Sequence, residues 1–251
     1  MSKKNNFGMR PLFSITLGVL IASLLLYLSS DLSLCAGSNG SLEKADEKIE
    51  GLWSYQELIP RGREGAPLTG WFLFHDGYFI QQSINDGEPF EEQMGMAHAG
   101  PYEAIEKGYQ IVAEIGIGVA ATSESPLSLR RNNEHQIFPE YSGDRLIITF
   151  GSGTVQTFKR IEVSKCQIFA LDKGYLGFAD NNFVLVTALE NGVITGSGTC
   201  KKEGSSLQLK VMRWFSVLDG QVSYLKDKIL NVKFDGKTLT LADGHVFHVT
   251  K

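Results

Sequence analysis

The stretch Gly70-Trp-Phe-Leu-Phe-His-Asp-Gly-Tyr-Phe-Ile80 decides the fold, because its pattern returns later in the chain. It matches Gly174-Tyr-Leu-Gly-Phe-Ala-Asp-Asn-Asn-Phe-Val184 at a constant offset of 104 residues. The glycine, two phenylalanines and the aspartate are identical in the two stretches. Each stretch places a turn between two runs of apolar and aromatic residues, which is typical of a β-hairpin. A repeated unit of this kind predicts two modules with the same architecture.

A second match supports the repeat. Ser142-Gly-Asp-Arg-Leu-Ile-Ile148 corresponds to Asp235-Gly-Lys-Thr-Leu-Thr-Leu241 at an offset of 93 residues, and a glycine turn and a final strand follow both. The smaller offset places deletions in the middle loops of the second module. The alternative is that the hairpins resemble each other through their turn chemistry alone.

The first module is predicted to contain eight antiparallel strands separated by turn residues. Short connections between such strands favour a closed barrel, because closure leaves no exposed sheet edge. Two longer breaks, Asp86–Gly100 and Ala120–Glu134, are expected to be loops at the barrel mouth. The predicted strands are Leu52–Leu58, Thr69–Phe74, Tyr78–Ile84, Tyr102–Ile105, Tyr109–Val119, His135–Tyr141, Arg145–Phe150 and Thr154–Ile161.

The N-terminus is predicted to be a hydrophobic targeting helix. Three basic residues precede an uncharged apolar run from Leu12 to Leu28. Positive residues before such a run hold the N-terminus in the cytoplasm and send the following chain across the membrane. We therefore expect residues 1–36 to be a signal peptide or a membrane anchor, and residues 37–49 to be a polar linker. Cleavage and lipidation near Cys35 both stay open.

The charge of the chain gives no reason to expect a nucleic acid partner. The whole chain has a net charge of −4. Residues 1–36 hold three basic residues and one acidic residue, which leaves 21 basic and 27 acidic residues, a net charge of −6, in the rest. A mildly acidic body without a basic stripe has no electrostatic attraction to nucleic acid. Membrane contact is expected through an uncleaved N-terminal segment, and the oligomeric state is not predicted.

Two cysteines remain outside the targeting segment. Cys166 and Cys200 are an even pair, and an exported chain enters an oxidising compartment. A disulfide between them is therefore expected. The alternative is two buried thiols.

Both ends of the first module carry the signature of a known family. Gly51-Leu-Trp53 opens its first strand, and Arg160 closes its last strand. A Gly-x-Trp and a late Arg resemble the signature of the lipocalins and fatty-acid-binding proteins, the calycins. The resemblance implies that Gly51, Trp53 and Arg160 form a barrel floor, in which the guanidinium packs on the indole ring.

The middle of the first module resembles the bacterial lipocalin-like domain. The resemblance covers about residues 50–162 and implies a lipocalin-like antiparallel β-barrel there. The second module, residues 164–251, lacks the Gly-x-Trp, so its assignment as a second, smaller barrel depends on the repeat. Lys251 stands where Arg160 does and keeps the charge without the planar stack. The matching segments are Gly70…Phe74-His-Asp-Gly-Tyr78, Ala99-Gly-Pro-Tyr102 and Gly143-Asp-Arg-Leu146.

Candidate ligand-binding residues follow from the resemblance and from the density of aromatic residues. Trp71, Phe74 and Tyr78 belong to the early strands, and Tyr102 belongs to a motif that the family turns inward. His98 falls in an expected mouth loop, where a ligand could meet it. A small barrel is either filled by side chains or holds one small ligand. The alternatives are therefore core aromatic residues and a surface histidine.

Other polar residues give weaker signals. Arg130 and Arg131 lie in the second expected loop, where they could pair with acidic residues, meet an anionic ligand or stay solvated. His245 and His248 are three residues apart in a strand and so point to opposite faces, which argues against a shared metal ion. The sequence contains no phosphate loop, dinucleotide fingerprint, zinc spacing or calcium loop. We expect no cofactor and no metal.

The sequence therefore predicts an all-β, envelope-located protein with two lipocalin-like barrels after a targeting helix. We expect its location to be the periplasmic or secreted side of the cell envelope, or the inner membrane if the anchor stays. The leading interpretation is binding of a small, mainly apolar molecule in the first barrel. The alternatives are a cofactor-independent isomerase or cyclase for an apolar biosynthetic intermediate, and a protein-interaction module without a cavity.

Overall fold

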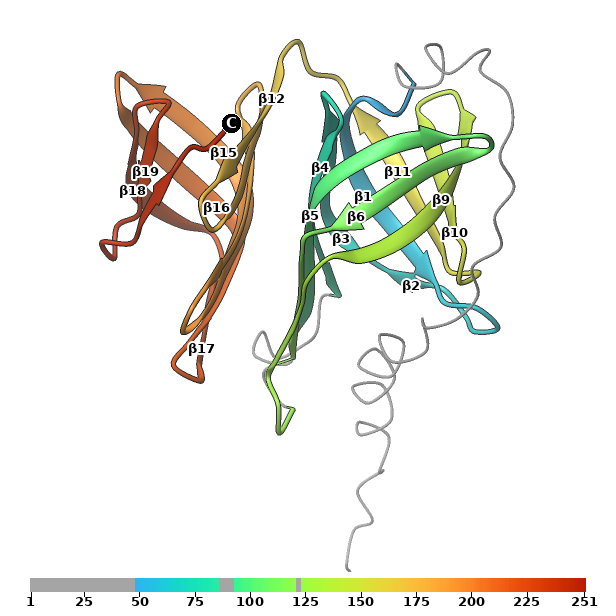
Figure 1. Cartoon of the computed structure of the whole chain (residues 1–251), viewed down its shortest axis with the longest axis horizontal. Coiled ribbons are helices and arrows are strands. Elements are labelled where there is room, and N and C mark those ends of the chain that lie inside the picture. Colours follow the sequence, from blue (N-terminus) through green and yellow to red (C-terminus); the bar gives the residue numbers. More distant parts are fainter. Residues whose placement is uncertain (1–47, 86–92, 121–122) are drawn as a thin grey trace, which may run out of the picture. The chain divides into compact units, whose positions relative to one another are not determined.

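The computed structural model describes residues 48–85, 93–120 and 123–251, and in these ranges the chain forms two β-barrels in tandem (Figure 1). The all-β tandem architecture predicted from the repeat is confirmed. No helix within these ranges has the length and apolar character that crossing a membrane requires. The predicted targeting segment and residues 37–47 of the predicted linker lie outside the described residues.

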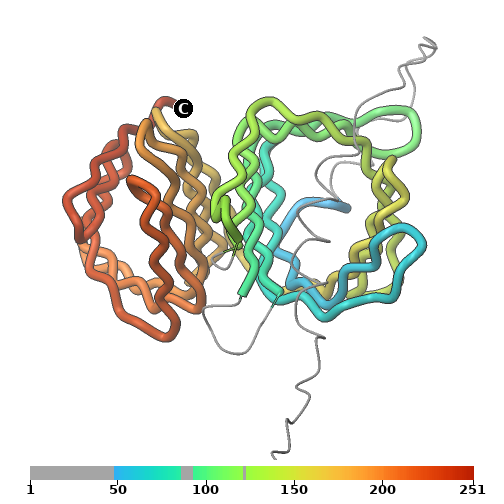
Figure 2. The backbone as a smooth tube through the Cα atoms, turned by 90° about the horizontal axis from the view of Figure 1, so that it is seen from below, coloured from blue at the N-terminus to red at the C-terminus, as the bar shows by residue number. Residues whose placement is uncertain are grey.

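The first barrel is a closed ring of antiparallel strands (Figure 2). The ring runs in the order β4-β3-β1-β11-β10-β9-β6-β5, and β5 pairs back with β4. β2 pairs with β1, while β7 pairs with β5 and β8 pairs with β7. The strands are β1 Gly51–Ile59, β2 Ala66–Pro67, β3 Thr69–His75, β4 Tyr78–Asn85, β5 Met94–Ile105, β6 Gly108–Ala113, β7 Ile115–Ala120, β8 Leu127–Arg130, β9 Asn133–Ser142, β10 Arg145–Phe150 and β11 Val155–Ile161.

The two expected mouth loops are wrong in part. β5 begins at Met94, inside the expected loop Asp86–Gly100, and β8 lies inside the expected loop Ala120–Glu134. The first half of β5 is rich in glycine and alanine, which have low β propensity and therefore give a weak strand signal. Hydrogen bonding to β4 on one side and to β7 on the other makes this segment a strand.

The second barrel is nearly closed. Its sheet runs in the order β12-β13-β14-β15-β16-β18-β19-β20, and β17 pairs with β16. β12 meets the C-terminal segment at an isolated bridge between Leu171 and Val249. The strands are β12 Cys166–Leu171, β13 Gly174–Ala179, β14 Asn182–Leu189, β15 Gly192–Glu203, β16 Ser206–Leu218, β17 Gln221–Leu225, β18 Lys228–Phe234, β19 Thr238–Thr240 and β20 Val246–His248.

The repeat extends beyond turn chemistry. The hairpins β3–β4 and β13–β14 have the same strand register at the offset of 104 residues. Asp76 and Asp180 occupy the left-handed region with φ of 49° and 48°, which Asp tolerates in tight turns. At Gly70 and Gly174 a Cβ would lie 2.0 and 2.2 Å from a carbonyl oxygen of the partner strand. The identical glycine and aspartate are therefore residues that the hairpin geometry requires.

Side-chain alternation on β3 separates two apolar cores. Phe72 and Phe74 point into the first barrel, whereas Trp71 and Leu73 point outward and pack against the second barrel. The outward residues belong to a shared cluster, which we call the inter-barrel core. It includes Trp71, Leu73, Ile80, Ala97, Ala99, Ile115, Ile117, Tyr175, Val184, Val186 and Phe215.

A polar group lies buried in the inter-barrel core. The Gln82 side chain is 0% exposed. Its Nε2 donates to Oγ1 of Thr195 at 3.2 Å, and its Oε1 accepts a hydrogen bond from Oγ of Ser197 at 2.5 Å. A buried amide that is bonded at both ends is stable in only one register, so this contact fixes how the two barrels pack.

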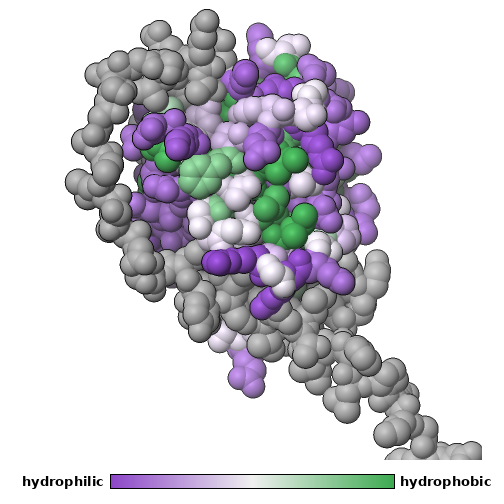
Figure 3. Space-filling view, turned by 90° about the vertical axis from the view of Figure 1, so that its right-hand side faces the viewer, coloured by the Kyte–Doolittle hydropathy of each residue, from purple (hydrophilic) through white to green (hydrophobic). Residues whose placement is uncertain are grey.

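The wall of the first barrel away from this core is half polar. On β9, Glu134 and Gln136 are exposed while Ile137 is 0% exposed. Such alternation is typical of an antiparallel sheet with one solvated face. Figure 3 shows one outer face of the barrel, where hydrophilic side chains surround a centre of apolar ones.

The expected disulfide is absent, because Cys166 and Cys200 are free thiols. Cys166 lies on β12 and Cys200 on β15, with β13 and β14 between them. Three strand spacings separate the two cysteines by roughly 14 Å, well beyond the ~7 Å limit for the Cα atoms of a disulfide. Burial raises the pKa of each thiol to about 11.

Candidate ligand-binding site

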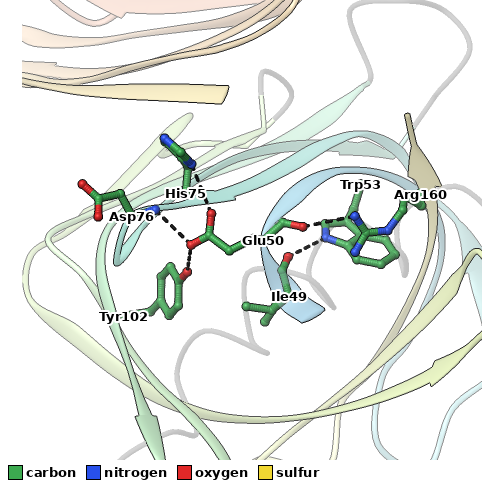
Figure 4. A network of polar contacts seen from close by, with 7 residues as sticks. All are labelled: Ile49, Glu50, Trp53, His75, Asp76, Tyr102 and Arg160. Carbon is green, nitrogen blue, oxygen red and sulfur yellow. Dashed lines mark hydrogen bonds and ion pairs between the residues drawn. The ribbon is translucent and has the colours of Figure 1, made fainter. Parts of the chain in front are cut away.

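One end of the first barrel is closed by Trp53 and the segment before it (Figure 4). Trp53 Nε1 donates to the carbonyl oxygen of Ile49 at 2.8 Å, and the Arg160 guanidinium lies 4.2 Å from the centre of the indole ring. Arg160 also donates to the carbonyl oxygens of Glu50 at 3.2 Å and Lys48 at 2.9 Å. Arg160 therefore stacks on Trp53 at this end of the barrel, and Gly51 leaves room for the guanidinium, which would lie 3.1 Å from a Cβ there.

The carboxylate of Glu50 links this closed end to the neighbouring strands (Figure 4). It accepts hydrogen bonds from the Tyr102 hydroxyl at 2.6 Å and from the backbone N–H of Asp76 at 2.9 Å, and it contacts His75 Nδ1 at 3.1 Å. The sequence did not identify Glu50, because the polar stretch before the first strand resembles a linker. Tyr102, expected to orient a ligand, instead holds the closed end together.

Aromatic rings fill the interior next to the closed end. Phe74 is 0% exposed and lies between Tyr102, at 5.4 Å between ring centroids, and Phe72, at 4.2 Å. Phe158 and Tyr55 continue the contacts, with centroids 4.5 Å apart. We call these five rings the aromatic layer. Because they occupy this half, a ligand inside the barrel would have to lie in the other half of the interior, which we call the mouth half.

A row of cross-strand neighbours lines the inner wall of the mouth half. Gln81 on β4 pairs with His98 on β5, His98 pairs with Gly116 on β7, and Gly116 pairs with Arg130 on β8. Their outward neighbours, such as Gln82, belong to the inter-barrel core, so the row faces inward. His98 is partly exposed although β5 is paired on both sides. This exposure is to the barrel interior, which solvent therefore enters.

Hydrogen bonds connect the aromatic layer to this row. The Tyr55 hydroxyl donates to Gln81 Oε1 at 3.1 Å, and Gln81 Nε2 contacts His98 Nδ1. Because the Gln81 oxygen is an acceptor for Tyr55, its NH₂ group donates to Nδ1, and the neutral His98 ring carries its proton on Nε2. Burial raises the pKa of Tyr55 well above its ordinary value, which keeps the hydroxyl protonated.

The histidines of the mouth half are held neutral. Burial, with smaller effects of His135 and Arg130, lowers the pKa of His98 to about 3. Burial and Arg130 also lower the pKa of His135, whose Nε2 contacts the Asn133 side-chain nitrogen at 2.9 Å. His98 was expected in a loop and lies instead in a strand, but it does face the mouth half. It can donate a hydrogen bond there, and it is too weak a base to accept a proton at neutral pH.

Gln156 adds an unpaired acceptor to the mouth half. It alternates with Phe158 on β11, pairs with Leu58 and Ile148, and is 8% exposed. Its Oε1 has no hydrogen-bond partner within the described part of the chain. The sequence analysis missed Gln156 and Gln81, although the two-residue period from Phe158 and from the equally buried Phe79 places both on the inner face.

Two predicted ligand contacts face away from the barrel interior. Trp71 is buried in the inter-barrel core. Tyr78 follows the turn on the outer side, and its hydroxyl accepts a hydrogen bond from Lys251 Nζ at 3.0 Å. Tyr78 and Lys251 line a pocket of about 240 Å³ that also includes Asp76 and Phe169. Placing Trp71 and Tyr78 inside the barrel was wrong, because alternation with Phe72 and Phe79 sends both outward.

The described residues contain no group of three or more metal-binding side chains. No protein-family model and no curated protein matches the chain. The geometry is compatible with a lipocalin-like fold: a closed eight-stranded first barrel, a Trp–Arg contact at one end and polar groups on the inner wall at the other.

Proposed function

We propose that this chain is an exported, envelope-located lipocalin-like protein that binds a small, mainly apolar molecule in the mouth half of its first barrel. The observation that carries the proposal is the buried, unpaired Oε1 of Gln156 on the inward face of β11. A buried acceptor without a donor costs about 1–3 kcal/mol in the free protein. A ligand N–H or O–H group that satisfies it recovers that free energy, which makes the position a recognition point.

The aromatic layer and the polar inner wall contribute to binding in different ways. Apolar parts of a ligand lie against the aromatic layer and gain roughly 25 cal/mol for each Å² of apolar surface removed from water. The polar groups of Gln81, His98 and Gln156 then fix its orientation, because each leaves a donor or an acceptor unsatisfied if the ligand turns.

Binding is favoured over catalysis by the state of His98. An isomerase or cyclase that moves a proton needs a group with a pKa near the working pH. The lowered pKa of about 3 makes His98 a hydrogen-bond donor instead of a base. We therefore place the cofactor-independent enzyme behind the binding protein.

The test compares two glutamine variants. Full-length protein is purified and analysed by native mass spectrometry for a co-purified small molecule, and titrated with the apolar dye N-phenyl-1-naphthylamine. We expect Gln156→Leu to weaken dye or ligand binding several-fold while leaving the free protein as stable as the wild type or more so. Gln136→Leu, on the exposed outer face of β9, serves as the matched control.

Two outcomes would contradict the proposal. One is wild-type protein that carries no small molecule and binds no apolar dye. The other is equal binding by both glutamine variants and the wild type. The export proposal is tested separately, by protease digestion of intact spheroplasts: protection of the barrels from protease would place them in the cytoplasm and contradict it.

A further inference from the structure

Arg130 brings a permanent positive charge to the inner wall of the mouth half. Its pairing with Gly116, which in turn pairs with His98, puts all three on the inward face. The side chain is partly exposed. On the described strands that line this half, no Asp or Glu takes an inward position, although the chain beyond residue 36 is acidic overall. The described inner wall of this half thus carries a positive charge in a protein that is acidic overall.

Because Gly116 has no side chain, the charged Arg130 and the neutral donor His98 border the same space beside it. A Cβ built on Gly116 would lie 3.5 Å from His98 Nε2 and 3.7 Å from Arg130 Cβ. Since Nδ1 of His98 accepts from Gln81, the ring proton is on Nε2, and the Cδ2–Nε2 edge of the ring lies beside Gly116. A guanidinium and an imidazole N–H that flank a residue without a side chain can both donate to one acceptor group. No ion pair joins Arg130 to a carboxylate of the described residues, and a partly buried cation of this kind is stabilised when an anion binds to it.

We propose that Arg130 and the Nε2–H of His98 form an anion subsite over Gly116, which takes the acidic group of a small organic acid. The inference depends on the proposed function and names the class of its ligand: an apolar body directed to the aromatic layer, with one carboxylate or similar monoanionic group at the row. His135 and Tyr55, two further titratable side chains near the row, are both neutral and add no competing charge.

Two dyes that differ in a single group test this subsite. The probe 1-anilinonaphthalene-8-sulfonate carries a sulfonate, and N-phenyl-1-naphthylamine is the same molecule without it. We expect the wild type to bind the sulfonate at least about tenfold more tightly, the change that one charge-assisted contact gives. Arg130→Gln should remove about that factor for the sulfonate and leave the neutral dye within about twofold. Arg131→Gln, at the neighbouring exposed residue, should change neither.

A second variant keeps the test decisive if Arg130→Gln folds poorly. Gly116→Val fills the space beside the two donors and presses on the His98 ring, whose Cδ2 would lie 3.1 Å from the new Cβ, so it should weaken the sulfonate more than the neutral dye. The inference is overturned if the wild type binds both dyes alike, or if these variants affect both dyes equally. If the wild type binds neither dye, the proposed function fails as well. Normal binding of the neutral dye with no preference for the sulfonate overturns the anion subsite alone.

Discussion

Acidification from pH 7 to pH 4 is expected to destabilise the first barrel through His98. A histidine in an unfolded chain takes up a proton near pH 6.5, whereas burial lowers the folded pKa of His98 to about 3. Below pH 6.5 the unfolded state therefore binds a proton that the folded state does not. The contribution of His98 to stability is complete above pH 6.5 and is lost as the pH falls towards 3. At pH 4 the loss is at most about 3 kcal/mol.

Urea unfolding of the wild type and of His98→Gln at several pH values measures this loss. Other groups titrate alike in the two proteins, so the difference between their unfolding free energies isolates His98. We expect the wild-type value relative to the variant to fall by about 3 kcal/mol between pH 7 and pH 4. The His98 ring should show no NMR titration above pH 5. Parallel loss of stability in both proteins, or a ring that titrates near pH 6.5, would refute the reasoning.

Three further predictions concern contacts away from the mouth half. Arg160→Lys keeps the charge but loses the planar stack on Trp53, so urea unfolding should show a loss of about 1–2 kcal/mol; no loss would contradict the role given to the stack. Ser197→Ala leaves the buried Gln82 oxygen without its donor and should cost about 1–3 kcal/mol. Adding Gln82→Leu should recover most of this cost, and a double variant as unstable as the single one would argue against the buried amide as its cause. The two cysteines of the second barrel should both react with a thiol reagent in denaturant, and a higher count after reduction would reveal a disulfide.

Local sequence signals predicted the hairpins and most strand positions. Turn chemistry such as Asp76-Gly77 is determined by residues next to each other, so it is visible in the chain, and the repeat added the second barrel. Trp53 and Arg160 were singled out because they resemble the signature of a known family. The glycine- and alanine-rich start of β5 was missed, since its strand conformation comes from pairing with β4 and β7 and not from its own propensity.

The sequence predicted the candidate site less well, for a physical reason. Which face of a strand is inside depends on what covers the other face, and the second barrel covers the outer face of β3 and β4. Both faces are then apolar, so the two-residue period that separates inside from outside disappears. Trp71 was therefore placed in the wrong core. Gln81 and Gln156 were overlooked although their two-residue spacing from Phe79 and Phe158 places both on the inner face. The expected disulfide between Cys166 and Cys200 was wrong because an even number of cysteines does not show how far apart they lie in the fold.

The inter-barrel core has a consequence for how the protein behaves at low concentration. Position for position, Trp71 corresponds to Tyr175 and Ile80 to Val184 at the repeat offset, and all four lie in this core. Equivalent hairpins of the two modules thus contribute to one contact, as in the isologous interface of a twofold dimer. Here the partners are joined by a short peptide, so their association is intramolecular. The pairing of the barrels is therefore independent of dilution, unlike that of two separate chains.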